Sequence, residues 1–257
     1  GRGRRGGALH ASLAQPVPDG AFTPETASPA VVQAWIGHIQ AGITAALDMV
    51  EHSNAQTPQP ETQALAARLC SQREQLLHQV ETLAHGAQGT LMTRIHGDFH
   101  LGQVLVVEND VVIIDFEGQP MVPLAERRHR HSPLRDVAGL LRSIAYAVDT
   151  ARPGGGETGS HPGAGQSAAR ASAYLAAFEQ EAGNTFLAGW SEGMGDAITA
   201  IGTADARAGL LQLFLMEKAA YEIRYEAANR PGWIVTPMAG LAALAGLKAQ
   251  PDPDRQP

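Results

Sequence analysis

The sequence predicts a mainly α-helical fold that carries one small β-hairpin. Apolar residues recur every three or four positions along several long stretches, which is the period that one face of an α-helix requires. Two runs of β-forming residues, 104–107 and 111–114, flank the polar residues 108–110 and predict the hairpin with a three-residue link. Stretches rich in glycine and proline separate these segments and predict loops.

The composition is that of a globular protein and argues against several classes of partner. The chain has 257 residues, of which 44% are hydrophobic and 18% charged, which suits one globular unit or two small ones. Its net charge of -7 argues against a nucleic-acid partner or an anionic membrane. The single cysteine, Cys70, excludes an internal disulfide and fits a cytoplasmic protein. No apolar run reaches the roughly 20 residues of a membrane-spanning helix, so we expect no membrane partner.

The first ninety residues predict a helical lead-in. Residues 1–6 match a dinucleotide-binding glycine pattern but lack the preceding strand that it needs, so we interpret them as the start of a helix. On that helix we expect His10 to be a packed or capping side chain. Residues 15–30 predict a surface loop, and apolar periodicity predicts one helix over 35–50 and another over 61–83.

Two carboxylates flank the predicted hairpin. Asp98 stands in a loop before it and Asp115 directly follows it. Because a hairpin folds the chain back on itself, the second carboxylate is expected to lie beside the first. Both strands are apolar throughout, so we also expect protein to cover both faces of the hairpin. The sequence therefore predicts a metal and phosphate site built from fewer than thirty consecutive residues.

Three chemistries can use this stretch. A binuclear metal site of the metallophosphoesterase type needs two further motifs that the sequence lacks. A single zinc site made of His96, Asp98 and His100 lacks a distant fourth ligand. Phosphoryl transfer needs an aspartate for the substrate hydroxyl, an amide that binds metal and a second aspartate after a hairpin. Asp98, Gln103 and Asp115 stand in that order, so we favour this third chemistry.

The same residues carry a resemblance to a known family. Residues 96–103 and 115–116 resemble the catalytic block of the aminoglycoside-phosphotransferase-like kinases, which belong to the protein-kinase-like superfamily. The match to maltokinases is narrower, is weak before residue 90, and extends over residues 97–103, 115–120, 123–128, 132–142, 217–226 and 229–233.

The resemblance implies a fold and a division of the chain. The fold is the C-terminal lobe of a protein-kinase-like (aminoglycoside phosphotransferase-like) fold, mainly α with a small β-hairpin. Residues 1–90 form the helical lead-in, 91–118 the catalytic loop and hairpin, and 119–257 a helical substrate-side region. A glycine-rich stretch, 152–166, is predicted to be a mobile loop within that region.

The resemblance also implies an activity. Maltokinases convert maltose and ATP to maltose 1-phosphate for α-glucan synthesis and are often fused to trehalose synthase. It thus implies ATP and Mg²⁺ as cofactors, maltose as substrate and trehalose synthase as a partner. The resemblance further implies an N-terminal lobe that grips ATP; we expect this sequence to lack it and the chain to be inactive alone. The alternatives are a non-catalytic module that docks on trehalose synthase or an α-glucan, and a kinase for a related sugar or aminoglycoside-type molecule.

Roles for the central residues follow from the resemblance. Asp98 is the expected base or orienter of the substrate hydroxyl. Gln103 and Asp115 are expected to hold Mg²⁺ against the phosphates of ATP. Gln103 stands where the wider family has asparagine, and both side chains offer an amide oxygen to a hard cation. His96 is a candidate catalytic residue, although we favour a role in shaping the loop.

Other residues near this block are weaker candidates. Glu117 is expected either to join the metal group or to form a salt bridge with Arg127 or Arg128, which begin a basic run over 127–131. His100 is a candidate substrate contact. The basic run itself is expected near phosphate or on a solvated surface. Asp136, on the helix that follows, is expected to brace the catalytic loop.

The helix predicted over 205–229 changes character along one face. The first half of that face is apolar and the second half is polar and aromatic. We interpret the second half as a sugar-binding wall, with the candidates Lys218, Tyr221, Glu222, Arg224 and Tyr225. The alternative is that Lys218 and Glu222 only form a surface i,i+4 pair, worth about 0.2–0.5 kcal/mol.

Overall fold

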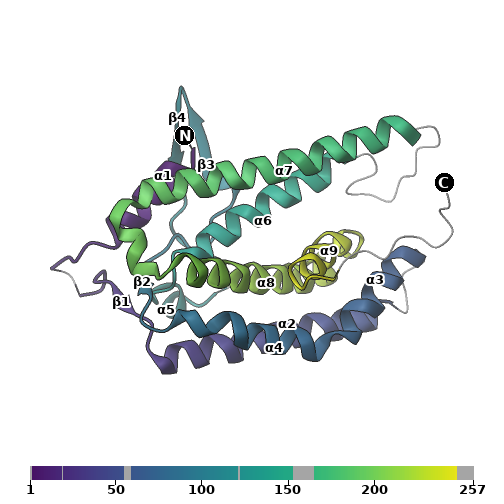
Figure 1. The fold of residues 1–257 in the computed structure, drawn as a ribbon, viewed down its shortest axis with the longest axis horizontal. Coiled ribbons are helices and arrows are strands. Elements are labelled where there is room, and N and C mark those ends of the chain that lie inside the picture. Colours follow the sequence, from purple (N-terminus) through teal and green to yellow (C-terminus); the bar gives the residue numbers. More distant parts are fainter. Residues whose placement is uncertain (1, 19, 55–58, 121, 153–164, 248–257) are drawn as a thin grey trace.

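The computed structural model describes residues 2–18, 20–54, 59–120, 122–152 and 165–247, and its long helices lie in three layers (Figure 1). The first layer holds α1 (Arg2–Leu13), α6 (Leu134–Ala151) and α7 (Gly165–Met194). The middle layer holds α8 (Ala204–Asn229) and α9 (Val235–Leu244), and the third holds α2 (Pro29–Asn54), α3 (Pro60–Ser71) and α4 (Arg73–Ala84). The prediction of a mainly helical fold is confirmed.

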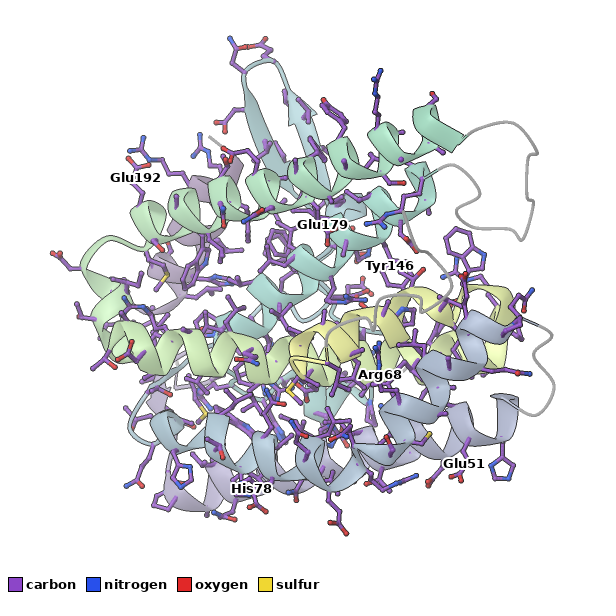
Figure 2. The ribbon with its side chains drawn as sticks, turned by 45° about the vertical axis from the view of Figure 1, so that its right-hand side comes forward. Glu51, Arg68, His78, Tyr146, Glu179 and Glu192 are labelled. Atoms are coloured by element: carbon purple, nitrogen blue, oxygen red, sulfur yellow. The ribbon has the colours of Figure 1, made fainter. Side chains whose placement is uncertain are left out.

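Helix α8 lies at the centre of the molecule because its apolar residues face both neighbouring layers. It contacts α2 and α4 on one side and α6 on the other. Leu210, Leu213 and Met216 are fully buried, and the ring of Phe214 meets Trp35 of α2 edge-to-face at 5.6 Å between centroids. Figure 2 shows side chains filling the space between the layers. Polar residues on α8 are therefore enclosed wherever they point toward α6.

Helix α2 is apolar enough to be compared with a membrane span. Among the described helices, its segment Pro29–His52 alone meets the length and hydropathy expected of such a span. The sequence led us to expect no such segment. Core helices meet the same test, and here Ile39, Ile43 and Leu47 are at most 1% exposed.

The periodic segment 61–83 forms two helices, so the prediction of one helix there is wrong. Helix α3 ends at Ser71 and α4 begins at Arg73, with Gln72 between them outside the helical region at φ -103° and ψ 16°. Arg73 pairs with Asp48 of α2 at 2.7 Å. Neither glycine nor proline marks the break, and the apolar period continues across it, so periodicity did not reveal it.

The glycines near the N-terminus have a packing role. Helix α1 lies against α7, and a Cβ on Gly7 would overlap the carbonyl oxygen of Trp190. Gly193 of α7 is equally close to the carbonyl oxygen of Arg4. The two backbones touch only because these positions carry no side chain. Gly3 and Gly6 of the N-terminal glycine pattern thus belong to a helix, as predicted.

The strands are short. Strand β1 (Glu25–Thr26) pairs with β2 (Leu91–Met92), and β3 (Val104–Val107) pairs with β4 (Asp110–Ile113), both antiparallel. Val107 pairs with Asp110, so the hairpin turn has two residues rather than the three predicted. Short helical turns complete the structure: η1 (His85–Ala87), η2 (Leu101–Gln103), α5 (Leu124–Arg127), η3 (Gly195–Ile201) and η4 (Pro231–Trp233).

The prediction that protein covers both faces of the hairpin is wrong for the described residues. Figure 1 shows β3 and β4 standing out from the helical layers. Leu105, Val106 and Val112 are 47–59% exposed, and only Val111 is buried. The hairpin is tied to α1 at its tip, where Asp110 pairs with Arg5. Apolar composition alone therefore did not indicate burial.

The predicted mobile loop 152–166 falls almost wholly outside the described residues. Residues 153–164 are not described, and residues 165 and 166 already belong to α7.

Candidate functional site

The loop that follows β2 carries Asp98 to the centre of the molecule. Gly97 has φ +82°, a left-handed conformation that glycine adopts without strain, and it turns the chain between His96 and Asp98. The loop is tied to α6, because Leu101 N–H donates to Ser143 Oγ at 3.0 Å. The chain then enters η2 and the hairpin.

Asp136 of α6 binds the backbone of this loop. Its carboxylate is 2% exposed and accepts hydrogen bonds from His96 N–H at 2.7 Å and Gly97 N–H at 2.9 Å. Burial raises the pKa of this carboxyl, but the hydrogen bonds from His10, Gly97 and His96 outweigh it and hold the pKa below its usual value. The geometry agrees with the expected bracing role of Asp136.

His10 and Trp190 extend this support to α1 and α7. Trp190 Nε1–H donates to His10 Nδ1 at 2.9 Å, and His10 Nε2 lies 3.0 Å from Asp136 Oδ2. Because indole nitrogen is only a donor, His10 Nδ1 must accept, so the ring is neutral and donates through Nε2. His10 is 1% exposed, which agrees with its expected packed role.

The ring of His96 forms hydrogen bonds with backbone groups of the loop and the hairpin. Its Nε2 donates to the carbonyl of Ile114 at 2.8 Å, and its Nδ1 accepts from Asp98 N–H at 3.3 Å. Both ring nitrogens are thus engaged, which favours loop shaping over direct catalysis. The ring joins the loop to the end of the hairpin strand. No group of three His, Cys, Asp or Glu side chains suited to a metal occurs among the described residues, so the structure does not support the zinc alternative.

Four candidate side chains form a line across the loop and the hairpin base. Asp98 Oδ2 lies 3.9 Å from His100 Nε2, which lies 3.3 Å from the Gln103 amide nitrogen. That amide nitrogen is 2.8 Å from Asp115 Oδ2. Asp115 itself has φ +64°, which aspartate tolerates better than most residues. The hairpin therefore brings Asp115 back to Gln103, whereas the sequence led us to expect it beside Asp98; His100 and Gln103 lie between the two carboxylates.

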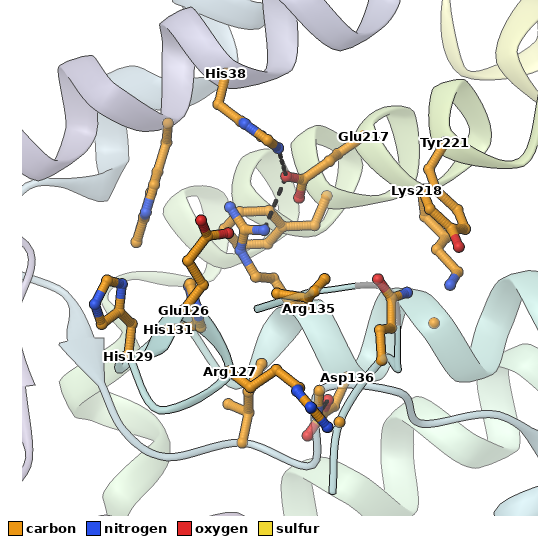
Figure 3. A pocket seen from close by; sticks show the side chains of 18 of the residues that line it. His38, Glu126, Arg127, His129, His131, Arg135, Asp136, Glu217, Lys218 and Tyr221 are labelled. Atoms are coloured by element: carbon orange, nitrogen blue, oxygen red, sulfur yellow. Dashed lines mark hydrogen bonds and ion pairs between the residues drawn. The ribbon is translucent and has the colours of Figure 1, made fainter. Parts of the chain in front are cut away.

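A pocket of about 820 Å³ opens beside Asp98 (Figure 3). Volumes of roughly 300–1,000 Å³ are typical of small-molecule sites. Its walls come from α2, the loop around Asp98, the segment around α5, α6 and α8. Asp98 is one of the lining residues, whereas Gln103 and Asp115 do not line the pocket.

Tyr221 of α8 is close enough to Asp98 to feel its charge. Burial, and then the negative charge of Asp98, raise the pKa of the Tyr221 hydroxyl. Lys218 Nζ lies 4.9 Å from the Tyr221 ring centroid and Arg224 Cζ 6.0 Å. Lys218, Tyr221 and Arg224 all line the pocket. Tyr225 stacks on Tyr221 with centroids 6.4 Å apart but does not line it.

The structure places Glu222 away from the pocket, so it is not a wall residue. It is 8% exposed and pairs with Arg142 of α6, with Nη2 2.7 Å from Oε2. The alternative pairing with Lys218 is not formed. Glu226 one turn later is also buried, and it accepts from the hydroxyl of Tyr146, labelled in Figure 2. Some residues in the polar half of the α8 face therefore line the pocket, and others form buried ion pairs and hydrogen bonds with α6.

Glu117 points to solvent. Its backbone carbonyl accepts from Arg127 Nη1 at 2.9 Å, whereas the structure gives its exposed carboxylate no ion pair among the described residues. The expected salt bridge is therefore a backbone contact. The basic run 127–131 lines one wall of the pocket through Arg127, His129, Arg130 and His131.

Sequence reasoning missed the opposite wall. Trp35 and His38 of α2 line the pocket together with Arg135 and Glu217. Arg135 Nη1 pairs with Glu217 Oε1 at 2.8 Å, and His38 Nε2 lies 3.7 Å from the same oxygen (Figure 3). The spacing of Trp35 and His38, three residues apart on a helix, was the one available signal.

Comparison with known proteins returns sugar kinases. Over 151 residues, 58% of this chain and 33% of the relative, the chain is 30% identical to a glucosamine kinase of Mycolicibacterium smegmatis. A glucosamine kinase of Streptacidiphilus jiangxiensis is 36% identical over 58 residues, which are 23% of this chain and 13% of that protein. No family model matches.

Solved structures give a longer match. A glucosamine kinase in complex with glucosamine, ADP and inorganic phosphate superposes with a TM-score of 0.70 over 94% of this chain and 50% of that one, at 22% identity. A second crystal form of glucosamine kinase gives 0.68 over 95% of this chain and 53% of that one, at 23% identity. The chain shares this fold and spans about half the length of these solved structures.

Proposed function

We propose that this chain is part of an ATP-dependent sugar kinase. The observation that carries the proposal is the position of Asp98, which lines the pocket and is linked through His100 to the pair Gln103 and Asp115. A kinase needs a carboxylate that reaches the acceptor hydroxyl close to the metal-bound phosphates, because that hydroxyl attacks the terminal phosphate directly. The sequence similarity to glucosamine kinases supports the same class of reaction.

In this proposal each group has one task. Asp98 accepts or orients the proton of the sugar hydroxyl. Gln103 and Asp115 are oxygen donors at the base of the hairpin, and Asp115 is exposed, so the pair fits Mg²⁺, which keeps several waters and shares its remaining positions with phosphates. Bound Mg²⁺ would neutralise charge on the phosphates of ATP. His96 and Asp136 keep the loop that carries Asp98 in place.

The acceptor that we propose is maltose, on the resemblance of residues 97–103 and 115–120 to maltokinases. The pocket's charges support a neutral sugar. Glu217 is paired with Arg135 and Glu25 with Arg130, whereas Lys218 and Arg224 have no carboxylate partner among the described residues. An ammonium group would meet mainly positive charge on the α8 wall.

Glucosamine is the second candidate, because the relatives are glucosamine kinases and one was solved with that sugar. Asp98 and the exposed Glu126 are the pocket carboxylates that would remain for its amino group.

The test has two parts. Calorimetric titration of this chain with maltose and with glucosamine measures which sugar the pocket binds. Transfer of labelled phosphate from ATP is then measured in the longest natural polypeptide that contains this chain. We expect Asp98→Asn to lower transfer by about 10²- to 10⁴-fold while sugar binding is retained. Asp149→Asn, at the far end of α6, is the control.

Each outcome discriminates. Binding of maltose but not glucosamine supports the maltokinase assignment, and the reverse supports a glucosamine kinase. Sugar binding without any phosphate transfer would contradict the enzyme and favour the non-catalytic module, whose docking on trehalose synthase or an α-glucan would then be the proposal to test.

A further inference from the structure

The side-chain amide of Gln103 has two neighbours that make opposite demands on it. The amide atom placed as nitrogen lies 2.8 Å from Asp115 Oδ2 and 3.3 Å from His100 Nε2. A carboxylate only accepts hydrogen bonds, so Asp115 favours the NH₂ group at that position. Gln103 is 9% exposed, so little water can mediate between the partners.

His100 favours the oxygen instead. The backbone N–H of Gly102 donates to His100 Nδ1 at 3.1 Å, which makes Nδ1 the acceptor of the ring. A neutral imidazole has one acceptor and one donor, so Nε2 carries the hydrogen. That N–H faces the Gln103 amide at 3.3 Å and Asp98 Oδ2 at 3.9 Å. With nitrogen at the shared position, two donors face each other.

A cation would satisfy both neighbours. The two ends of a glutamine amide have nearly the same shape, so turning the amide by half a rotation puts its oxygen at the shared position. His100 Nε2–H then donates to Gln103 Oε1, and two oxygens, Gln103 Oε1 and Asp115 Oδ2, lie 2.8 Å apart. Adjacent oxygens around an octahedral Mg²⁺ with bonds of about 2.0–2.1 Å lie roughly 2.9 Å apart.

We propose that His100 is a positioning residue that turns the Gln103 amide oxygen toward Asp115 and so prepares this pair to bind a divalent cation. The proposal rests on the metal role that the proposed function gives to Gln103 and Asp115. Without the cation, the Asp115 carboxylate favours the amide nitrogen of Gln103 at the shared position. With the cation bound, both the cation and His100 favour the amide oxygen there. His100 therefore serves the metal pair rather than the sugar.

The first test measures the tautomer of His100 and needs no metal. Two-bond ¹H–¹⁵N spectra of this chain are recorded at about pH 8, where an ordinary histidine is neutral. We expect the hydrogen of His100 on Nε2. A hydrogen on Nδ1 would remove the donor on which the proposal depends and overturn it.

The second test measures cation affinity with Mn²⁺ as the probe, read from the broadening of the Gln103 side-chain amide resonances. We expect His100→Phe to weaken Mn²⁺ binding by about 10- to 100-fold, the usual effect of removing a residue that orients a metal ligand. His100→Gln retains an N–H donor and should recover part of the affinity. His78→Phe, at an exposed site on α4, is the matched control.

The outcomes separate this proposal from the proposed function. Equal affinity in wild type and His100→Phe overturns the positioning role and leaves the metal pair standing. Broadening elsewhere but not at Gln103 overturns both the positioning role and the metal role of Gln103. Neither result bears on sugar binding, which the titration with maltose and glucosamine measures separately.

Discussion

Replacing Asp136 with alanine removes the acceptor that three donors share, two of them on buried residues. His10 Nε2–H, His96 N–H and Gly97 N–H all point to this carboxylate, at 2.7–3.0 Å. Each buried donor left without a partner lowers the stability by about 1–3 kcal/mol. Part of this loss is offset, because the alanine variant no longer has to bury a carboxylate. We therefore expect a total loss of about 3–5 kcal/mol, as when one partner of a buried polar pair is removed.

Urea unfolding followed by circular dichroism measures this loss. Asp149→Ala on the same helix is the matched control, and because its carboxyl is about a third exposed we expect it to cost about 1 kcal/mol or less. Asp136→Asn keeps one acceptor oxygen and should fall between the two, which leaves a folded variant to study if the alanine variant does not fold. A loss below about 1 kcal/mol for Asp136→Ala would refute the reasoning, since the two buried donors of His10 and His96 alone, left unpaired, should cost more than that.

Three further predictions concern the pocket and its surroundings. Tyr221→Ala should raise the dissociation constant for the bound sugar by about 3- to 10-fold and Tyr225→Ala by much less, measured by calorimetry, because only the first lines the pocket. Burial, and then nearby positive charge, lowers the pKa of His131 to about 4. The unfolded chain therefore binds a proton at this histidine more readily than the folded protein does, and the free energy of unfolding should fall by up to about 1.4 kcal/mol per pH unit as pH falls from about 6.5 toward 4. His131→Gln should flatten that slope in urea unfolding at several pH values. Gly139→Ala should lower the free energy of unfolding by about 1–3 kcal/mol and weaken sugar binding, because the new Cβ would lie 2.7 Å from the Phe99 carbonyl oxygen. Gly37→Ala is the control and should leave stability unchanged or raise it, because nothing lies within 4 Å of its Cβ position.

The arrangement of the loop and hairpin at the candidate site could be predicted from the sequence because its geometry is local. Asp98, Gln103 and Asp115 lie within eighteen consecutive positions, and a hairpin has few ways to close. Once the two strands pair, Asp115 must return to the loop. The bracing role of Asp136 needed the family resemblance, because its partners lie forty residues away and one, His10, lies 126 residues away.

The errors arose where the partner was distant or was not signalled by pattern. Glu222 and Lys218 share a polar helix face, but α6 supplies Arg142 to one of them and the pocket receives the other. A helix wheel shows which residues share a face and cannot show what faces them. The opposite wall of the pocket, with Trp35 on α2, is separated from Asp98 by more than sixty residues and was missed for the same reason.

The hairpin is a further case in which the sequence pattern did not show what surrounds a side chain. Its apolar strands led to an expectation of burial, yet Leu105, Val106 and Val112 are about half exposed in the described part of the chain. Contiguous exposed apolar side chains are unusual on an isolated globular surface. They lie on the strands that place Gln103 and Asp115, the pair to which the proposal assigns the metal and the phosphates. An ATP-dependent kinase must enclose those phosphates, and the chain spans about half the length of the solved kinases whose fold it shares. The exposed hairpin is therefore where we expect the nucleotide-gripping part of the proposed enzyme to pack, and adding it should protect the amides of β3 and β4 from hydrogen exchange.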